Sequence, residues 1–279
     1  MSEYAIQMLG ITKTFPGIIA NDNVNLEVRK NEVLAILGEN GAGKSTTIKL
    51  ILNMLKKESG EINLFGKDFD DSVKEDVGAV LDDLGLPDCL DIKKTEKVMK
   101  GIFKNWESDT YFDLCQRLRI PYDKTIKDFS KGNRAKLAIV IALSHRAKLL
   151  LLDEPTSGLD PLVRDEILDI LNDYTREDNH SILISSHIVS DLEKLCDYIV
   201  FIHNGRIILC KEKDELVNEY GTVNLSADDF AKIDSEHILH YEKNPYGIRA
   251  IVKRAAGKYD FERVDIEELF VAMIKELNR

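Results

Sequence analysis

The sequence lacks the features of several common protein classes. Its four cysteines are scattered and form no C-x-x-C pair. We therefore expect neither a zinc site nor a disulfide framework, and reduced cytosolic thiols fit best. No apolar run approaches the roughly 18 residues that a membrane span needs, and the N-terminal residues lack the basic-then-apolar pattern of a signal peptide. If the protein acts at a membrane, we expect it to do so through a partner.

Basic residues are also in the minority. The chain has 38 Lys and Arg against 49 Asp and Glu, which gives a net charge of −11. A general nucleic-acid binder needs a basic face, so we expect no nucleic-acid partner. Internal repeats, low-complexity tracts and sustained heptads are absent from the sequence. The 279 residues, 44% hydrophobic and 31% charged, suit one large or two smaller globular domains with a real core.

The strongest motif is a glycine-rich run with the pattern G-x-x-x-x-G-K-S. An apolar run at 33–37 precedes it, and apolar residues at helical spacing follow it, so the context is strand, loop and helix. Backbone N–H groups of such a loop, together with the start of the helix, bind phosphate. Lys44 supplies a charge for the β- and γ-phosphates, and the Ser45 hydroxyl can hold Mg²⁺. The run is Gly38-Glu39-Asn40-Gly41-Ala42-Gly43-Lys44-Ser45-Thr46.

Two further apolar runs end in groups that suit phosphate chemistry. Leu149 to Leu152 predict a central parallel strand that is buried on both faces and ends in Asp153 and Glu154. Asp153 is then a candidate Mg²⁺ ligand, and Glu154 is placed to orient or deprotonate an attacking water. A second strand, at 181–186, ends at His187, on the side of the sheet where ligands bind. A histidine there can bond a γ-phosphate oxygen.

Four signals are weaker, and each has an ordinary structural reading beside the functional one. Phe15, expected in a Pro-Gly loop, can stack on a base or simply belong to the core. Asp82, at the end of a strand near 77–81, can face an ion or stand in an exposed acidic loop. Ser130 begins a short turn before a helix expected from about Arg134, and it can help bind an anion or only cap the helix. Asp160 lies in a turn before a helix that starts at Pro161.

Taken together, these motifs resemble the ATP-binding subunit of an ABC transporter over about residues 3–217. The run 38–46 resembles the Walker A loop, 149–154 resembles Walker B with its catalytic glutamate, and 157–160 resembles the D-loop. His187 resembles the switch histidine, and Phe15 resembles the aromatic that stacks on adenine. Ser130-Lys131-Gly132-Asn133 resembles the signature motif, with Lys131 in place of Gly and Asn133 in place of Gln. Position 82, where the family normally carries glutamine, is Asp. These departures are similar to those of a bacterial exporter branch that resembles antibiotic-resistance and sodium-export ATPases.

The resemblance implies an α/β fold of the P-loop NTPase class. Its parts are a mixed sheet core, an antiparallel β subdomain and an inserted helical subdomain. We expect the ATP-binding domain at residues 1–217, with the helical subdomain at about 87–147. A small α/β C-terminal extension without a chemical motif is expected at 218–279.

The resemblance also implies a mechanism with ATP and Mg²⁺ as cofactors. Glu154 and His187 would be catalytic, and Ser45, Asp82 and Asp153 would hold the metal. The signature would act in trans on the nucleotide of a second ATP-binding subunit, and Asp160 would communicate across that interface. A transmembrane permease subunit would be the other partner, at the inner face of the cell membrane, and dimer closure would power export. The ATP-binding residues would be Phe15, Gly38, Glu39, Asn40, Gly41, Ala42, Gly43, Lys44, Ser45 and Thr46.

Two other functions fit parts of the pattern. A soluble ABC ATPase that acts on a macromolecular complex usually has two nucleotide domains or long coiled-coil insertions, and this sequence shows neither. An unrelated phosphate-loop kinase would share the glycine-rich run. The signature, the D-loop and the switch histidine argue against a kinase.

Overall fold

A six-stranded sheet forms the centre of the molecule in the computed structural model, which describes residues 3–245 and 247–278. Its first five strands are parallel, and the last is antiparallel to its neighbour. Asn204 and Gly205 connect the last two strands in a tight hairpin turn, and both residues have the positive φ that such a turn requires. The strands, in spatial order, are β5 (Val77–Val80), β6 (Leu149–Asp153), β7 (Ser181–Ser185), β3 (Val33–Gly38), β8 (Tyr198–His203) and β9 (Arg206–Glu212).

Both faces of this sheet are covered, which is why its inner strands are continuously apolar. Leu34 and Ile36 of β3 belong to one apolar cluster, together with residues of helix α1 (Lys44–Ile51). Val33, Ala35 and Leu37 alternate with them and belong to a second cluster on the opposite face. Helices α6 (Pro161–Thr175) and α7 (Val189–Leu195) cover that second face.

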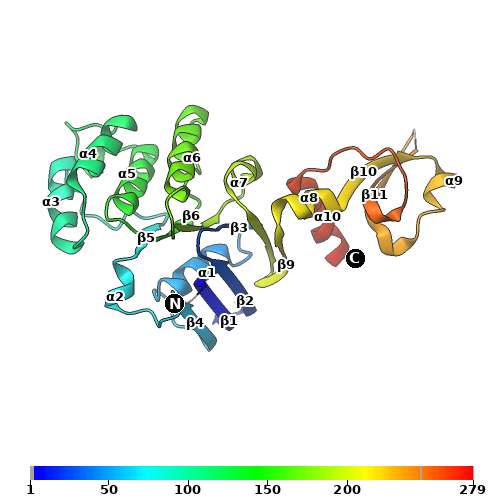
Figure 1. Cartoon of the computed structure of the whole chain (residues 1–279), viewed down its shortest axis with the longest axis horizontal. Helices are drawn as coiled ribbons and strands as arrows, with labels where there is room; N and C mark the ends of the chain where they lie inside the picture. Colours follow the sequence, from blue (N-terminus) through cyan, green and yellow to red (C-terminus); the bar gives the residue numbers. More distant parts are fainter. Residues whose placement is uncertain (1–2, 246, 279) are drawn as a thin grey trace.

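An antiparallel sheet lies below α1 in Figure 1, on the same side as the first cluster. Its strands are β2 (Ile18–Arg29), β1 (Tyr4–Phe15) and β4 (Ser59–Leu64), in that spatial order. β1 extends to Phe15, into the region where the sequence predicted a Pro-Gly loop. Phe15 is its last residue and pairs with Ile18, so it stands at a strand end and not within a longer loop. Gly17, with φ +81°, permits this tight turn. The short helix α2 (Asp71–Lys74) then leads to β5.

Three helices between β5 and β6 form the inserted helical segment, at one end of the molecule (Figure 1). They are α3 (Ile92–Ile102), α4 (Ser108–Arg117) and α5 (Lys131–Leu143). Trp106 is partly buried beside the ring of Tyr111. The prediction that α5 begins near residue 134 is wrong by one turn. Ser130 is the cap, because its hydroxyl accepts a hydrogen bond from Asn133 N at 3.2 Å.

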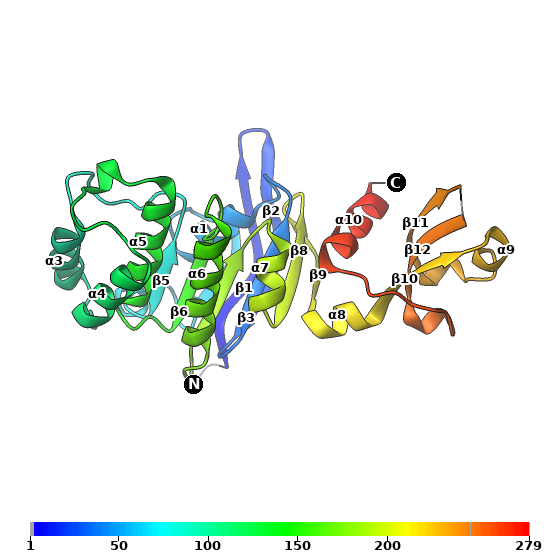
Figure 2. The ribbon, with the colours of Figure 1, turned by 90° about the horizontal axis from the view of Figure 1, so that it is seen from above.

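The C-terminal residues form a three-stranded sheet with helices at the opposite end (Figure 2). These strands and helices are of the α/β type expected for this region; Tyr246 lies outside the described residues. Helix α10 returns to the central sheet, where the Phe270 ring packs edge-on against Phe201 of β8 at 5.2 Å. The elements are α8 (Lys213–Glu219), β10 (Tyr220–Leu225), α9 (Ala227–Phe230), β11 (Ile238–Asn244), β12 (Gly247–Lys253) and α10 (Ile266–Leu277).

Among the described residues, each helix is too short or too polar to cross a lipid bilayer.

Candidate functional site

The glycine-rich run forms a tight loop between β3 and α1. Gly43 has φ +112°, and a Cβ atom at this position would lie 2.4 Å from the carbonyl oxygen of Ala20. Only glycine fits both constraints. No side chain among the described residues caps α1. The N–H groups of its first turn therefore remain available to an anion at the positive end of the helix.

Lys44 lies at the centre of this loop and is buried, with 6% of its surface exposed. Its Nζ donates to the carbonyl oxygens of Gly38 at 2.8 Å and Glu39 at 3.3 Å. The same atom lies 3.6 Å from Oε1 of Glu154. The loop and the end of β6, more than a hundred residues apart in sequence, thus meet through one ion pair.

Asp153 is buried at the end of β6, with 3% of its surface exposed. Its Oδ1 accepts a hydrogen bond from the Ser185 hydroxyl at 2.6 Å. No cation of the described chain forms an ion pair with it, although a buried carboxylate without one is unfavourable. Because α1 packs against β6, Ser45 in the first turn of α1 belongs to the same edge of the sheet. Hydroxyl and carboxylate oxygens are the ligands that Mg²⁺ prefers, so these residues fit that ion.

Glu154 has an unusual backbone for a residue other than glycine. Its φ is +53°, in the left-handed region, directly before Pro155. Such strain persists where the surroundings enforce it, and functional sites are common among those places. The turn aims the carboxylate at two cationic or polar groups: Oε2 lies 2.5 Å from Nδ1 of His187, while Oε1 faces Lys44. The predicted catalytic pair is therefore in direct contact.

The signature residues and the D-loop pack against one another within the chain. A Cβ atom at Gly132 would lie 3.3 Å from Leu159, and one at Gly158 would lie 3.9 Å from Cδ of Lys131. Ser130 and Lys131 are exposed at the start of α5. Asp160 is exposed too, and it caps α6 by accepting a hydrogen bond from Val163 N at 3.1 Å.

A small cavity of about 70 Å³ brings several of these motifs together. It is lined by Asp82, Lys131, Asp153 and Glu154, among others. Asp82 is exposed at its mouth, beside the two carboxylates that end β6. The cavity therefore joins the predicted metal ligands to one residue of the signature.

Phe15 stands at the tip of the hairpin between β1 and β2 and is 41% exposed. The ammonium of Lys13 lies 5.1 Å from the ring centroid, and Glu58 holds it at 2.9 Å. The hydrogen bond from Lys13 also lowers the pKa of Glu58. Further along β2, Asn21 donates to the Thr47 hydroxyl of α1 at 2.9 Å, which ties the hairpin to the phosphate loop. Because its ring is exposed at the tip of the hairpin, Phe15 is not a core residue.

Several residues that support the site were missed from the sequence. Asn21 fastens α1 to β2, and His203 of β8 lies 3.2 Å from the carboxylate of Glu39. Thr156 and Asp191 form a buried hydrogen bond between the segments that follow β6 and β7. These residues belong to no motif, and each contacts a partner far away in the sequence. Asn21 lies within β2 and Asp191 within α7, so no common sequence signal marks these residues.

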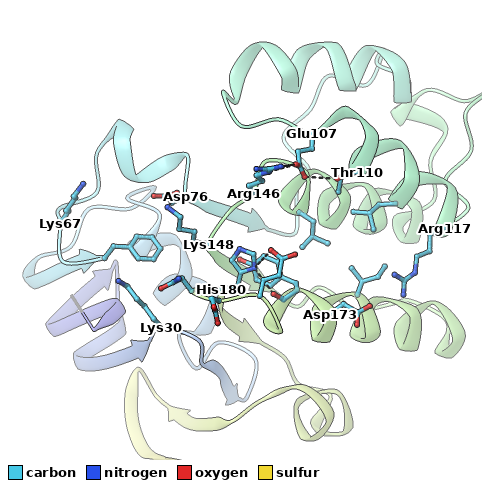
Figure 3. Close-up of a pocket in the computed structure, with 18 residues that line it drawn as sticks. Lys30, Lys67, Asp76, Glu107, Thr110, Arg117, Arg146, Lys148, Asp173 and His180 are labelled. Atoms are coloured by element: carbon cyan, nitrogen blue, oxygen red, sulfur yellow. Dashed lines mark hydrogen bonds and ion pairs between the residues drawn. The ribbon is translucent and has the colours of Figure 1, made fainter. Parts of the chain in front are cut away.

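A much larger cavity, of about 1190 Å³, lies at the opposite edge of the sheet (Figure 3). Asp76, Lys148 and His180, which line it, come just before the starts of β5, β6 and β7. Glu107 accepts hydrogen bonds there from Arg146 and Thr110. None of the predicted site residues lines this cavity. The volume of a cavity therefore does not identify the candidate site, whose residues lie where the parallel strands end.

Comparison with known proteins places this geometry in a family. The ABC transporter family model matches residues 21–157. The lantibiotic transport ATP-binding protein SrtF of Streptococcus pyogenes is 38% identical over 195 residues, which is 69% of this chain and 84% of the relative. The bacitracin transport ATP-binding protein BcrA of Bacillus licheniformis is 32% identical over 208 residues, 73% of this chain and 68% of that one. A solved structure of an ATP-binding subunit of an ABC transporter superposes with a TM-score of 0.69 at 26% identity, covering 76% of this chain and 91% of that structure. The predicted fold class and family are confirmed: the chain belongs to the ATP-binding proteins of ABC transporters, the ATPase subunits that power transport.

Proposed function

We propose that this chain binds Mg-ATP on the loop around Lys44 and hydrolyses it with Glu154 and His187. The observation that carries the proposal is the position of the Glu154 carboxylate. It contacts both His187 and Lys44, and Lys44 is the side chain that the phosphate loop encloses. A carboxylate at this place is within reach of a water that faces the γ-phosphate, and it can accept the proton of that water.

The other side chains hold the reacting groups in place. The first-turn N–H groups of α1 and the Lys44 ammonium bind the β- and γ-phosphates. Ser45, Asp153 and Asp82 would hold Mg²⁺, which supplies positive charge to the phosphates when it is bound. His187 contacts Glu154 through Nδ1, and its Nε2 would bond a γ-phosphate oxygen.

The remaining predicted residues act between two ATP-binding subunits. Ser130, Lys131, Gly132 and Asn133 form the cap and first turn of α5, where Ser130 and Lys131 are exposed. A helix start suits the γ-phosphate of the nucleotide on the second subunit. Asp160, exposed beside them, contacts the same partner. Closure then depends on nucleotide because the phosphates supply the charge that both faces need.

The partners and location follow from the family. We propose a transmembrane permease subunit as the second partner, with this chain peripheral on the cytoplasmic face of the cell membrane. Similar proteins are named for bacitracin and lantibiotic transport, which favours export. We place the nucleotide-binding domain at 1–217, its helical subdomain at about 87–147 and the extension at 218–279.

The proposal is tested with the purified full-length chain. We expect phosphate release from ATP only with Mg²⁺, and co-purification of a protein with several membrane spans when the chain is isolated from membranes. Isolation with ribosomes or DNA in place of such a protein would contradict the transporter role.

Phe15→Ala is expected to weaken ATP binding about 5- to 100-fold, since stacking of an aromatic ring on a base contributes roughly 1–3 kcal/mol. Affinity for inorganic tripolyphosphate should not change, because it has no base. Calorimetry with both ligands measures the difference. Ile18→Ala, an exposed apolar change on the same hairpin, is the control. An equal loss for both ligands would show that Phe15 only supports the loop.

Lys131→Ala is expected to weaken ATP-driven dimerisation about 10-fold, the low end for a hydrogen bond to a charged group. Its ammonium adds a cation at the phosphate held between two subunits. Sedimentation of the variant in a Glu154→Gln background, with Mg-ATP, measures the dimer. Lys127→Ala removes an exposed lysine four residues earlier and serves as the control. Unchanged dimerisation would leave Lys131 as a solvated side chain.

A further inference from the structure

A buried contact beyond the strand ends joins the two segments that carry Glu154 and His187. The Thr156 hydroxyl donates to Oδ2 of Asp191 at 2.7 Å. Thr156 is fully buried, and Asp191 is 2% exposed. Nε of Arg164 lies 3.8 Å from the same carboxylate oxygen. Thr156 follows Glu154 by two positions, and Asp191 follows His187 by four. Arg164 follows Asp160 by four positions.

This carboxylate is not an obvious stabiliser of the fold. A buried charge is unfavourable unless it is paired and hydrogen-bonded, and apolar replacements of buried ion pairs are often neutral or stabilising. The pair here is incomplete, because Nε of Arg164 is buried and makes no hydrogen bond to a described residue. Since the buried Asp191 carboxylate is not needed to stabilise the fold, we attribute it to a need to hold the segments around it in one orientation.

The contacts around His187 show which segments are held relative to one another. Helix α7 begins at Val189, directly after the segment with His187, and the Ser186 hydroxyl accepts a hydrogen bond from Ile188 N at 2.9 Å. Where β6 and β7 end, Glu154 N donates to Ser185 O at 3.0 Å, and Oε2 of Glu154 contacts Nδ1 of His187 at 2.5 Å. These contacts all lie at the strand ends. Asp191 adds an attachment beyond them, on the first turn of α7. The strand-end contacts and this attachment together define how His187 faces Glu154.

We propose that Asp191 is a positioning residue for ATP hydrolysis. Through Thr156 it holds the turn after β6 against the helix that follows His187. Through Arg164 it also contacts α6, which begins at the D-loop residue Asp160. A displacement of Asp160 by the second subunit therefore reaches His187 along α6, Arg164 and Asp191. This inference rests on the proposed roles of Glu154 and His187.

The first test is Asp191→Asn, which keeps the size of the side chain and an acceptor oxygen but removes the charge. We expect kcat for Mg-ATP to fall about 10- to 100-fold, since a misplacement near 1 Å has effects of that size. KM and the affinity for ATP should stay within about twofold, because the phosphate loop is untouched. Thr156→Ser retains the hydroxyl and should keep the wild-type kcat. Tyr174→Phe, which removes a hydrogen bond of 2.8 Å to Ala147 O away from the site, is the control.

The second test separates positioning from stability. Thr156→Val, Asp191→Leu and Arg164→Met together remove the hydroxyl, the carboxylate and the guanidinium beside it. None of the three is left without a partner, so the thermal midpoint should stay near that of the wild type. We expect kcat to remain low in this triple variant. Recovery of kcat together with the thermal midpoint, or a wild-type kcat in Asp191→Asn, would overturn the proposal. A wild-type rate in Glu154→Gln would instead overturn the catalytic role on which it rests.

Discussion

Glu154→Gln is expected to lower kcat for Mg-ATP by about 10²- to 10⁴-fold, the usual contribution of a general base. The amide has the shape of the carboxylate but cannot accept the proton of the attacking water. ATP binding should persist, because the glycine-rich loop and Lys44 are unchanged. Removal of a carboxylate 3.6 Å from the Lys44 ammonium also frees that cation for the phosphates. Phosphate release measures kcat, and calorimetry measures binding.

The same variant should accumulate as a dimer with Mg-ATP, since closure needs nucleotide and opening needs hydrolysis. Size-exclusion chromatography with and without Mg-ATP shows this. Glu177→Gln, which makes the same change at the opposite edge of the sheet, is the control and should behave as wild type. Normal turnover by Glu154→Gln would exclude Glu154 as the base.

Lys44→Ala is expected to weaken Mg-ATP binding at least about 30-fold, because loss of one partner of a buried charge pair has an effect of 2–5 kcal/mol or more. The ammonium is buried among loop carbonyls, so no other described side chain of the loop can supply its charge to the phosphates. Hydrolysis should fall with binding. Titration of a fluorescent ATP analogue measures the affinity.

Lys49→Ala is the matched control for Lys44→Ala, since it removes a lysine from the far end of the same helix. It should leave the affinity within about twofold, because the dipole effect and the charge act only over the first turn. Wild-type affinity in Lys44→Ala would mean that phosphate binds elsewhere.

The motif residues were predictable because their chemistry is local. The glycines determine the backbone conformation of their own loop. The apolar runs that end at Asp153 and His187 align at one edge of any parallel sheet. The structure brings Lys44, Glu154 and His187 into contact, as those patterns indicate. The patterns thus predicted that these three side chains lie together.

Contacts between distant segments were not predictable. The hydrogen bond from Thr156 to Asp191 depends on how two loops pack, which no spacing encodes. The start of α5 was predicted one turn late, because capping by Ser130 outweighs the poor helix propensity of Gly132 and Asn133. The length of β1 depends on its pairing with Ile18, so Phe15 was expected in a loop.

Two departures from the family pattern meet in one place. Asp82 stands where glutamine is usual, and Lys131 stands where glycine is usual. Both line the cavity that also contains Asp153 and Glu154. One change adds a negative charge and the other a positive charge, so the total charge facing the cavity is preserved. The positive charge of Lys131 thus offsets the negative charge that Asp82 brings to the cavity.

The contact between Phe270 and Phe201 limits how this protein can be shortened. A fragment that ended at residue 217 would uncover aromatic and aliphatic surface on β8 and α7, including Leu192 and Leu195. Exposed apolar patches of this kind favour aggregation. A shortened chain would therefore need polar replacements on that face to stay in solution, so the extension also serves as the cover of this side of the nucleotide-binding domain.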